Sequence, residues 1–195
     1  MEGVVASREA EGGRSRDRWI GVYIGILAAI LAVTAMGGDN AAKTANAKNI
    51  QAANTWSFFQ AKNLRRQIIR AQIEQLELKL VDLPPNEDSR RLELSDRIAK
   101  YKATESKLTT DPESGEGLDE LFVKGKALEH ERDRAMAQDP FFDYGQALLQ
   151  IAIVLASIAI IIGGNSMLVA SGLVGFGGVL MTLNGFTLWV MIPGL

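Results

Sequence analysis

The sequence predicts an all-α membrane protein with three transmembrane helices and an extramembrane antiparallel coiled-coil hairpin. The first observation is the distribution of charge: no charged residue lies between Arg18 and Asp39 or after Asp143. Residues 39–143, in contrast, hold 17 Lys or Arg and 19 Asp or Glu. The second observation is that residues 40–83 contain neither proline nor glycine and place apolar residues at alternating four- and three-residue steps.

The first span follows a cytoplasmic tail (1–18) and occupies 19–38. Its apolar part, WIGVYIGILAAILAVTAM, is close to the roughly 20 residues that a helix needs to cross a bilayer. A cleaved signal peptide is the alternative, because arginines precede the stretch and small residues end it. The apolar run is longer than the roughly 7–15 residues usual in signal peptides, so a retained span is favoured.

The apolar stretch at the end of the chain is too long for one crossing. It divides into spans at 147–163 and 166–192, because the GGNS sequence between them offers glycines for a helix end and polar residues to begin the next helix. Two spans with a re-entrant end is the alternative. Arg14, Arg16 and Arg18 lie beside the first span, so the positive-inside rule predicts a cytoplasmic N-terminus and places residues 39–146 outside.

Small residues recur at helical spacing in all three spans, and such residues let helix backbones approach closely in lipid. These candidates for transmembrane helix packing are Gly21, Gly25, Ala29 and Ala32 in the first span, Ala152 and Ala156 in the second, and Ser171 and Gly175 in the third. Asn184 could add a hydrogen bond between helices. Oligomerisation and packing within one chain explain these stripes equally well.

The charged middle region (39–146) is predicted to fold back on itself. One helix is expected to continue from about Arg18 to about Val81, with a seam formed by Ile69, Ile73, Leu76, Leu80 and Leu83. A turn at 82–88 contains two prolines, and a loop at 109–117 contains a proline and two glycines. The helices expected after these breaks are 87–108 and 118–138, the latter continuing into the second span.

An aromatic cluster, NTWSFFQAKNLRR, lies about 30 Å beyond the first span if the helix continues. Antiparallel pairing would bring Trp56 opposite about Lys126, near Phe122, Leu128 and His130. Packing within the chain is therefore the leading interpretation of Trp56 and Phe59, ahead of a protein-partner site, nucleic acid or lipid. Phe58 points about 160° away from Trp56 and about 100° away from Phe59 on a helical wheel, which indicates a second neighbour.

These residues carry a resemblance. WSFFQAK after the first span, RLELSDRIAKYKATESKL in the hairpin and ALEHERDRAMAQDPFFDYGQALLQ before the second span are similar to a widespread family of small bacterial membrane proteins classified as a domain of unknown function. Trp56, Phe58, Phe59, Gln60 and Lys62 match its W-x-[YF]-[YF]-Q-x-K pattern. The resemblance implies a multi-pass protein of the bacterial inner membrane with a periplasmic hairpin, and it transfers no catalytic residues. Many members have basic residues where this chain has GGNS.

No residue pattern indicates an enzyme, a cofactor, a metal or a small-molecule substrate. His130 is the only histidine, it lies between two glutamates, and adjacent helical positions point about 100° apart, so convergent metal ligands are not expected. Asp139 and Asp143 flank Pro140 and are interpreted as polar groups where the chain enters the membrane. The net charge of −2 gives no basis for binding nucleic acid.

The function predicted is therefore that of an integral membrane structural or interaction protein, either self-assembling or an accessory subunit of a larger membrane complex. The interface residues expected are Trp56, Phe58, Phe59, Gln60, Lys62, Phe122 and Leu128. An oligomeric channel or transport accessory protein is the alternative, although the spans lack the ionisable residues that usually mark an ion pathway.

Overall fold

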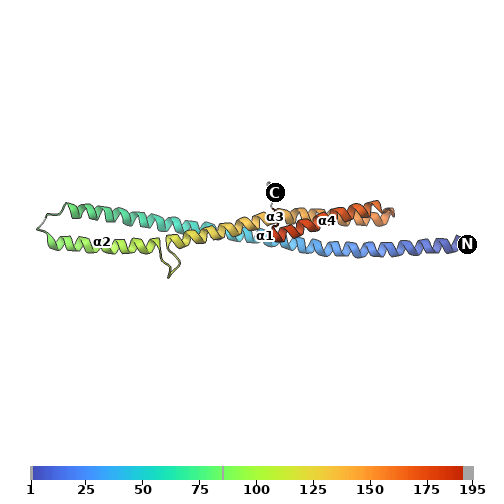
Figure 1. Cartoon of the computed structure of the whole chain (residues 1–195), viewed down its shortest axis with the longest axis horizontal. Helices are drawn as coiled ribbons and strands as arrows, with labels where there is room; N and C mark the ends of the chain where they lie inside the picture. The colour runs from blue at the N-terminus through green and yellow to red at the C-terminus, as the bar shows by residue number, and fades with distance from the viewer. Residues whose placement is uncertain (1, 85, 191–195) are drawn as a thin grey trace. The chain divides into compact units, whose positions relative to one another are not determined.

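Four α-helices make up the fold. The computed structural model describes residues 2–84 and 86–190, with residues 2–14 described by their backbone only. The helices are α1 (Glu2–Val81), α2 (Asp88–Thr109), α3 (Leu118–Ile162) and α4 (Ser166–Thr187) (Figure 1). The described part of the chain contains no strand, so the predicted all-α class is confirmed. Helices α1, α3 and α4 each contain a stretch long and apolar enough to cross a membrane.

Two helix boundaries differ from those expected. Helix α1 begins at Glu2 and not near Arg18, because the preceding residues include no proline and so leave the backbone free to continue the span. The third span was expected to extend to residue 192, but α4 ends at Thr187. Residues 191 and 192 of that expected span, and Pro85 of the expected turn, lie outside the described residues.

Helix α3 is continuous from the charged region into the second apolar stretch. Pro140 lies inside it and cannot donate a backbone hydrogen bond to the preceding turn. The helix continues through Pro140 despite this missing hydrogen bond. The third helix and the second span expected from the sequence therefore form a single helix.

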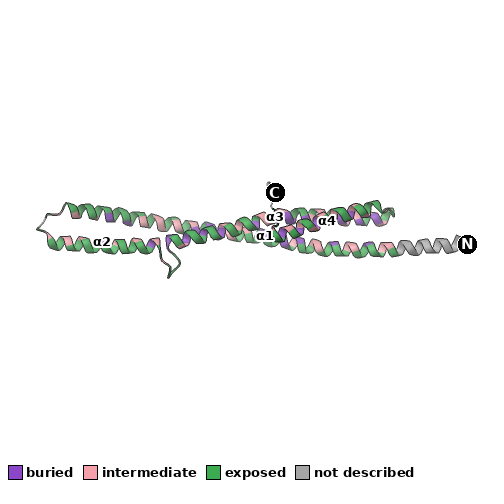
Figure 2. Ribbon diagram, viewed as in Figure 1, coloured by how far each residue is buried: buried purple, intermediate pink, exposed green. Residues whose placement is uncertain are grey.

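The described residues form two compact units. The first, here the apolar unit, contains residues 2–45 and 133–190, and the second, here the charged unit, contains residues 46–132. Buried and exposed positions alternate along each helix with a short period, as expected for helices that bury one stripe (Figure 2).

The apolar unit packs through small residues and a few hydroxyl groups. Its core contains Leu27 of α1 with Leu149 and Ala152 of α3. Ser171 Oγ donates a hydrogen bond to the Ala152 carbonyl at 2.7 Å and lies 3.2 Å from Tyr23 Oη, which ties α4 to both neighbours. Such bonds are worth about 0.6–2 kcal/mol each in lipid.

Two glycines make room for the ring of Phe142 in this unit. The ring of Phe142 lies against Gly37 of α1 and Gly185 of α4, where an added Cβ would come within 2.5 Å and 2.9 Å of it. Phe186 meets the same ring edge-on at a centroid separation of 4.8 Å. A buried hydrogen bond of 2.9 Å joins the hydroxyls of Thr34 and Thr182.

The charged unit pairs α1 with α2 and with the first part of α3. Ile69 and Ile73 of α1 form a core with Ile98 and Leu108 of α2. Two ion pairs join α1 to α2 beside this core, one between Arg70 and Glu105 and one of 2.7 Å between Glu77 and Lys102, and a third pair of 2.6 Å joins Lys48 of α1 to Glu131 of α3. Partner numbers fall as the α1 number rises, so α1 runs antiparallel to both helices here.

Candidate interaction surface

Three aromatic rings form the centre of the charged unit's α1–α3 contact. Trp56 lies edge-on to Phe59 at 5.6 Å and to Phe122 at 5.7 Å between ring centroids. Edge-to-face pairs at this separation are the favoured geometry for aromatic rings. The structure therefore brings together three of the residues that the sequence singled out, from two helices far apart in the chain.

Polar groups fix the indole of Trp56. Its Nε1–H donates a hydrogen bond to Glu129 at 2.9 Å, and the Lys126 ammonium lies 5.7 Å from the ring centroid. Hydrogen bonds from Lys126, and secondarily from Trp56, lower the pKa of Glu129. Gly125 lies directly beneath the ring, since a Cβ there would come within 2.9 Å of it. Leu128 of α3 is buried as well.

Phe58 lies on a different side of α1 from the cluster. Its side chain is 45% exposed, and the Lys62 ammonium lies 5.4 Å from its ring centroid while also donating to the Glu116 carbonyl. Gln60 is exposed as well. Phe58 and Gln60 are thus surface residues of α1. The second neighbour that the sequence predicted for Phe58 stays a prediction.

Helix α1 carries a second apolar seam that the sequence reasoning missed. The predicted seam is largely buried, with Ile69 at 9% and Ile73 at 6% exposure. On another face, Leu64 is 60% and Ile68 is 52% exposed. The exposed apolar set on this face is Ala61, Leu64, Ile68 and Ala71, at three- and four-residue steps, followed by Leu78 seven residues after Ala71, with the polar Gln75 at the position between them. Its spacing is that of a coiled-coil seam, so periodicity alone could have revealed it.

The small-residue stripes divide into two groups. Ala152, Ala156, Ser171 and Gly175 are buried between helices of the apolar unit, and a Cβ on Gly175 would lie 3.3 Å from Ala152. The stripe on α1 is different: Gly21, Gly25, Ala29 and Ala32 are all exposed, and a Cβ on either glycine would meet nothing within 4 Å. The first group packs within the chain, and the second does not.

The sequence suggested Asn184 as a hydrogen-bonding residue between helices, but its side chain bonds the backbone of Val190 in the segment that follows its own helix. Leu188 adopts a left-handed conformation (φ 51°) that ends α4 and turns the chain back. The Asn184 side chain therefore reaches the backbone of Val190, donating to its carbonyl at 2.8 Å and accepting from its N–H at 2.9 Å. Its polar atoms are occupied by this local cap.

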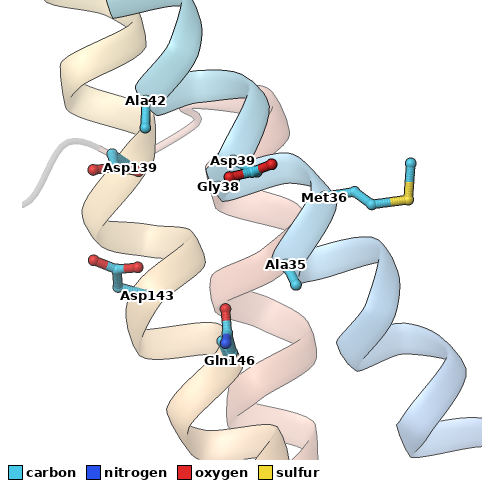
Figure 3. A pocket seen from close by; sticks show the side chains of 8 residues that line it. All are labelled: Ala35, Met36, Gly38, Asp39, Ala42, Asp139, Asp143 and Gln146. Carbon is cyan, nitrogen blue, oxygen red and sulfur yellow. The ribbon is translucent and has the colours of Figure 1, made fainter.

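A cavity of about 570 Å³ with three aspartates in its lining lies in the apolar unit, where the apolar stretch of α1 ends and that of α3 begins. Asp39 contributes from α1, and Asp139 and Asp143 contribute from successive turns of α3 (Figure 3). Lys43 pairs with Asp39 at 2.6 Å. Burial, together with the neighbouring Asp143, raises the pKa of Asp139. The position of Asp139 and Asp143 at a membrane boundary stays a prediction, and the approach of Asp39 was not predicted from the sequence.

A metal centre is not evident where the structure can be described. Among the side chains described, those of residues 15–84 and 86–190, no three histidine, cysteine or acidic groups converge as ligands. His130 is exposed on α3, in keeping with a solvated helix surface. The candidate surface is thus made of apolar side chains and ion pairs.

These features define an all-helical protein in which α1, α3 and α4 contain stretches suited to a membrane and residues 46–132 form a charged unit. The chain belongs to the DUF4337 family, a domain of unknown function, whose model matches residues 16–188. This confirms the resemblance to an uncharacterised family. No curated protein and no solved structure matches the chain.

Proposed function

We propose that this chain is a membrane structural or interaction protein that self-associates through α1. The exposed seam Ala61–Leu64–Ile68–Ala71–Leu78 is the observation that carries the proposal. Soluble helices rarely leave such a regular apolar stripe uncovered, and burying a leucine or isoleucine side chain is worth about 1.5–3 kcal/mol. A hairpin of α1 with α2 and α3 would hold this stripe outward as one strand of a coiled coil.

A second copy fits this seam better than an unrelated protein. Two copies inserted alike in one bilayer would run α1 parallel to α1. In a parallel pair, Glu74 and Lys79 occupy flanking heptad positions that face each other across the two helices, with opposite charges. Within the span, the exposed Gly21–Gly25 pair gives α1 a stripe suited to close helix contact in lipid.

Mass measurement in a mild detergent tests this assignment. The wild-type chain is expected to be a dimer or larger, and the Leu64→Glu/Ile68→Glu variant a monomer, because each glutamate would bury an unpaired charge in the seam. The control is Leu92→Glu/Val123→Glu, whose side chains are equally exposed (66% and 68%) on α2 and α3. A monomeric wild type, or dissociation in the control as well, would contradict the proposal. A ring around a hydrated axis would favour a channel instead.

We place the N-terminus in the cytoplasm of a bacterial inner membrane and the charged unit outside. Arg16 and Arg18 support this orientation, because basic residues beside a span remain on the cytoplasmic side. The chain has no cysteine, so Ser114→Cys gives a single exposed thiol and leaves Gly115, with its φ of 67°, unchanged. In intact cells an impermeant maleimide should label this thiol. Labelling only after lysis would reverse the assigned orientation.

A further inference from the structure

A groove with a charged mouth lies between α1 and α4 at the end of the apolar unit nearest Arg16. Its volume is about 300 Å³, and its lining residues are Arg16, Trp19, Ile20, Tyr23, Leu168 and Gly172. One lining residue is cationic and the others are uncharged. Gly172 keeps the groove open, because a Cβ there would meet nothing within 4 Å.

The Arg16 guanidinium is held at this mouth by the chain itself. It donates from Nη1 to the Gly163 carbonyl, where α3 has just ended, and Nη2 lies 3.5 Å from Asp17. Its Nε–H is buried and has no partner within the described structure. The Arg16 side chain is about 33% exposed, so its accessible part can donate a charge-assisted hydrogen bond to a phosphate group at the mouth.

The surroundings are those of a membrane interface. Trp19 is largely exposed beside Arg16, and tryptophan is enriched where hydrocarbon meets headgroups. Arg18 adds a second exposed cation, and the turn between α3 and α4 (163–165) carries no charge. Among residues 15–20, two arginines outnumber the single acid Asp17, in contrast to the end of the unit that holds Asp39, Asp139 and Asp143.

We propose that this groove binds an anionic phospholipid. The phosphate lies against Arg16 at the mouth, and one acyl chain follows the apolar wall past Ile20 and Leu168 toward Gly172. Charge complementarity selects the headgroup, since basic pockets between membrane helices hold anionic lipids. The inference requires the apolar unit to lie in a bilayer, but it is independent of the proposed self-association.

Native mass spectrometry of the full-length protein, titrated with phosphatidylglycerol or phosphatidylcholine, tests the site. Phosphatidylglycerol should bind at least about fivefold more tightly, the effect of roughly one basic residue near an anionic lipid. Arg16→Gln should remove that preference. Gly172→Leu should weaken both lipids by filling the groove, while Gly177→Leu, on the same helix outside the groove and with an added Cβ 3.8 Å from Leu148, should weaken neither.

Three results would overturn the proposal. The two lipids would bind the wild type equally if the groove held only annular lipid. Arg18→Gln would abolish the preference as fully as Arg16→Gln if surface charge alone attracted the headgroup. Inorganic phosphate at millimolar concentration would displace phosphatidylglycerol if the site recognised an anion without its acyl chains.

Discussion

Gly178→Leu should strongly destabilise the apolar unit. A Cβ at this position would lie 2.9 Å from Leu149 Cγ and 3.1 Å from both the Gly145 carbonyl and the Leu149 nitrogen. Two of these three atoms belong to the backbone of α3, so a side-chain rotation cannot relieve the clash. Helices α3 and α4 would have to separate, at a cost of about 1–3 kcal/mol or more.

Thermal unfolding in mild detergent, followed as loss of the monodisperse size-exclusion peak after heating, measures this effect. Each kcal/mol should lower the midpoint by about 2–4 °C in a chain of this length. The matched control is Gly172→Leu on the same helix, where no atom lies within 4 Å of the new Cβ. If both variants lowered the midpoint of thermal unfolding equally, the loss of a glycine from α4 would explain the destabilisation, and the close contact of α4 with α3 would not.

Trp56→Ala should destabilise the contact between α1 and α3 in the charged unit. It removes a ring packed between Phe59 and Phe122 and leaves Glu129 without its indole donor. Replacing a well-packed tryptophan by alanine costs about 3–5 kcal/mol, and Trp56 belongs at the lower end because it is only partly buried. A cost of about 3 kcal/mol corresponds to a roughly 100-fold change in a local opening equilibrium.

Amide hydrogen exchange of the full-length protein reports that opening. Amides in segments 50–66 and 118–130 should exchange roughly 100-fold faster in the variant if they open together as a local cooperative unit. The control is Phe58→Ala, two residues away on the same helix, where the side chain is 45% exposed and lies outside the aromatic cluster. If Phe58→Ala accelerated exchange as much as Trp56→Ala, the aromatic cluster would not be the element that joins α1 to α3.

The sequence contained enough to predict the helices and the main contact between them. Uncharged runs identified the apolar stretches, while the prolines near residue 85 and the glycines around residue 115 identified the breaks. Antiparallel pairing then placed Trp56 opposite about Lys126, and Lys126 does lie over its ring. Each of these inferences uses only local composition and a constant rise per residue.

The details that need a register between helices were not predictable in this way. Phe142 lies between Gly37 and Gly185, residues from three helices whose lateral alignment no sequence period specifies. Asn184 serves its own helix end because the chain turns back at Leu188, a reversal that the apolar sequence does not announce. The spacing of the exposed seam on α1 can be recognised in the sequence. It was overlooked because the same helix carries the more apolar seam that is buried.

Disulfide trapping in native membranes tests most directly whether α1 carries the interface between copies. In a parallel pair, equal seam positions face each other, and a disulfide requires Cα atoms within about 7 Å. Because the chain has no cysteine, Leu64→Cys introduces one thiol on the exposed seam and Leu92→Cys introduces one on α2. Self-association through α1 predicts a disulfide-linked dimer for Leu64→Cys under mild oxidation and none for Leu92→Cys. No dimer at position 64, or equal dimer at both positions, would contradict it.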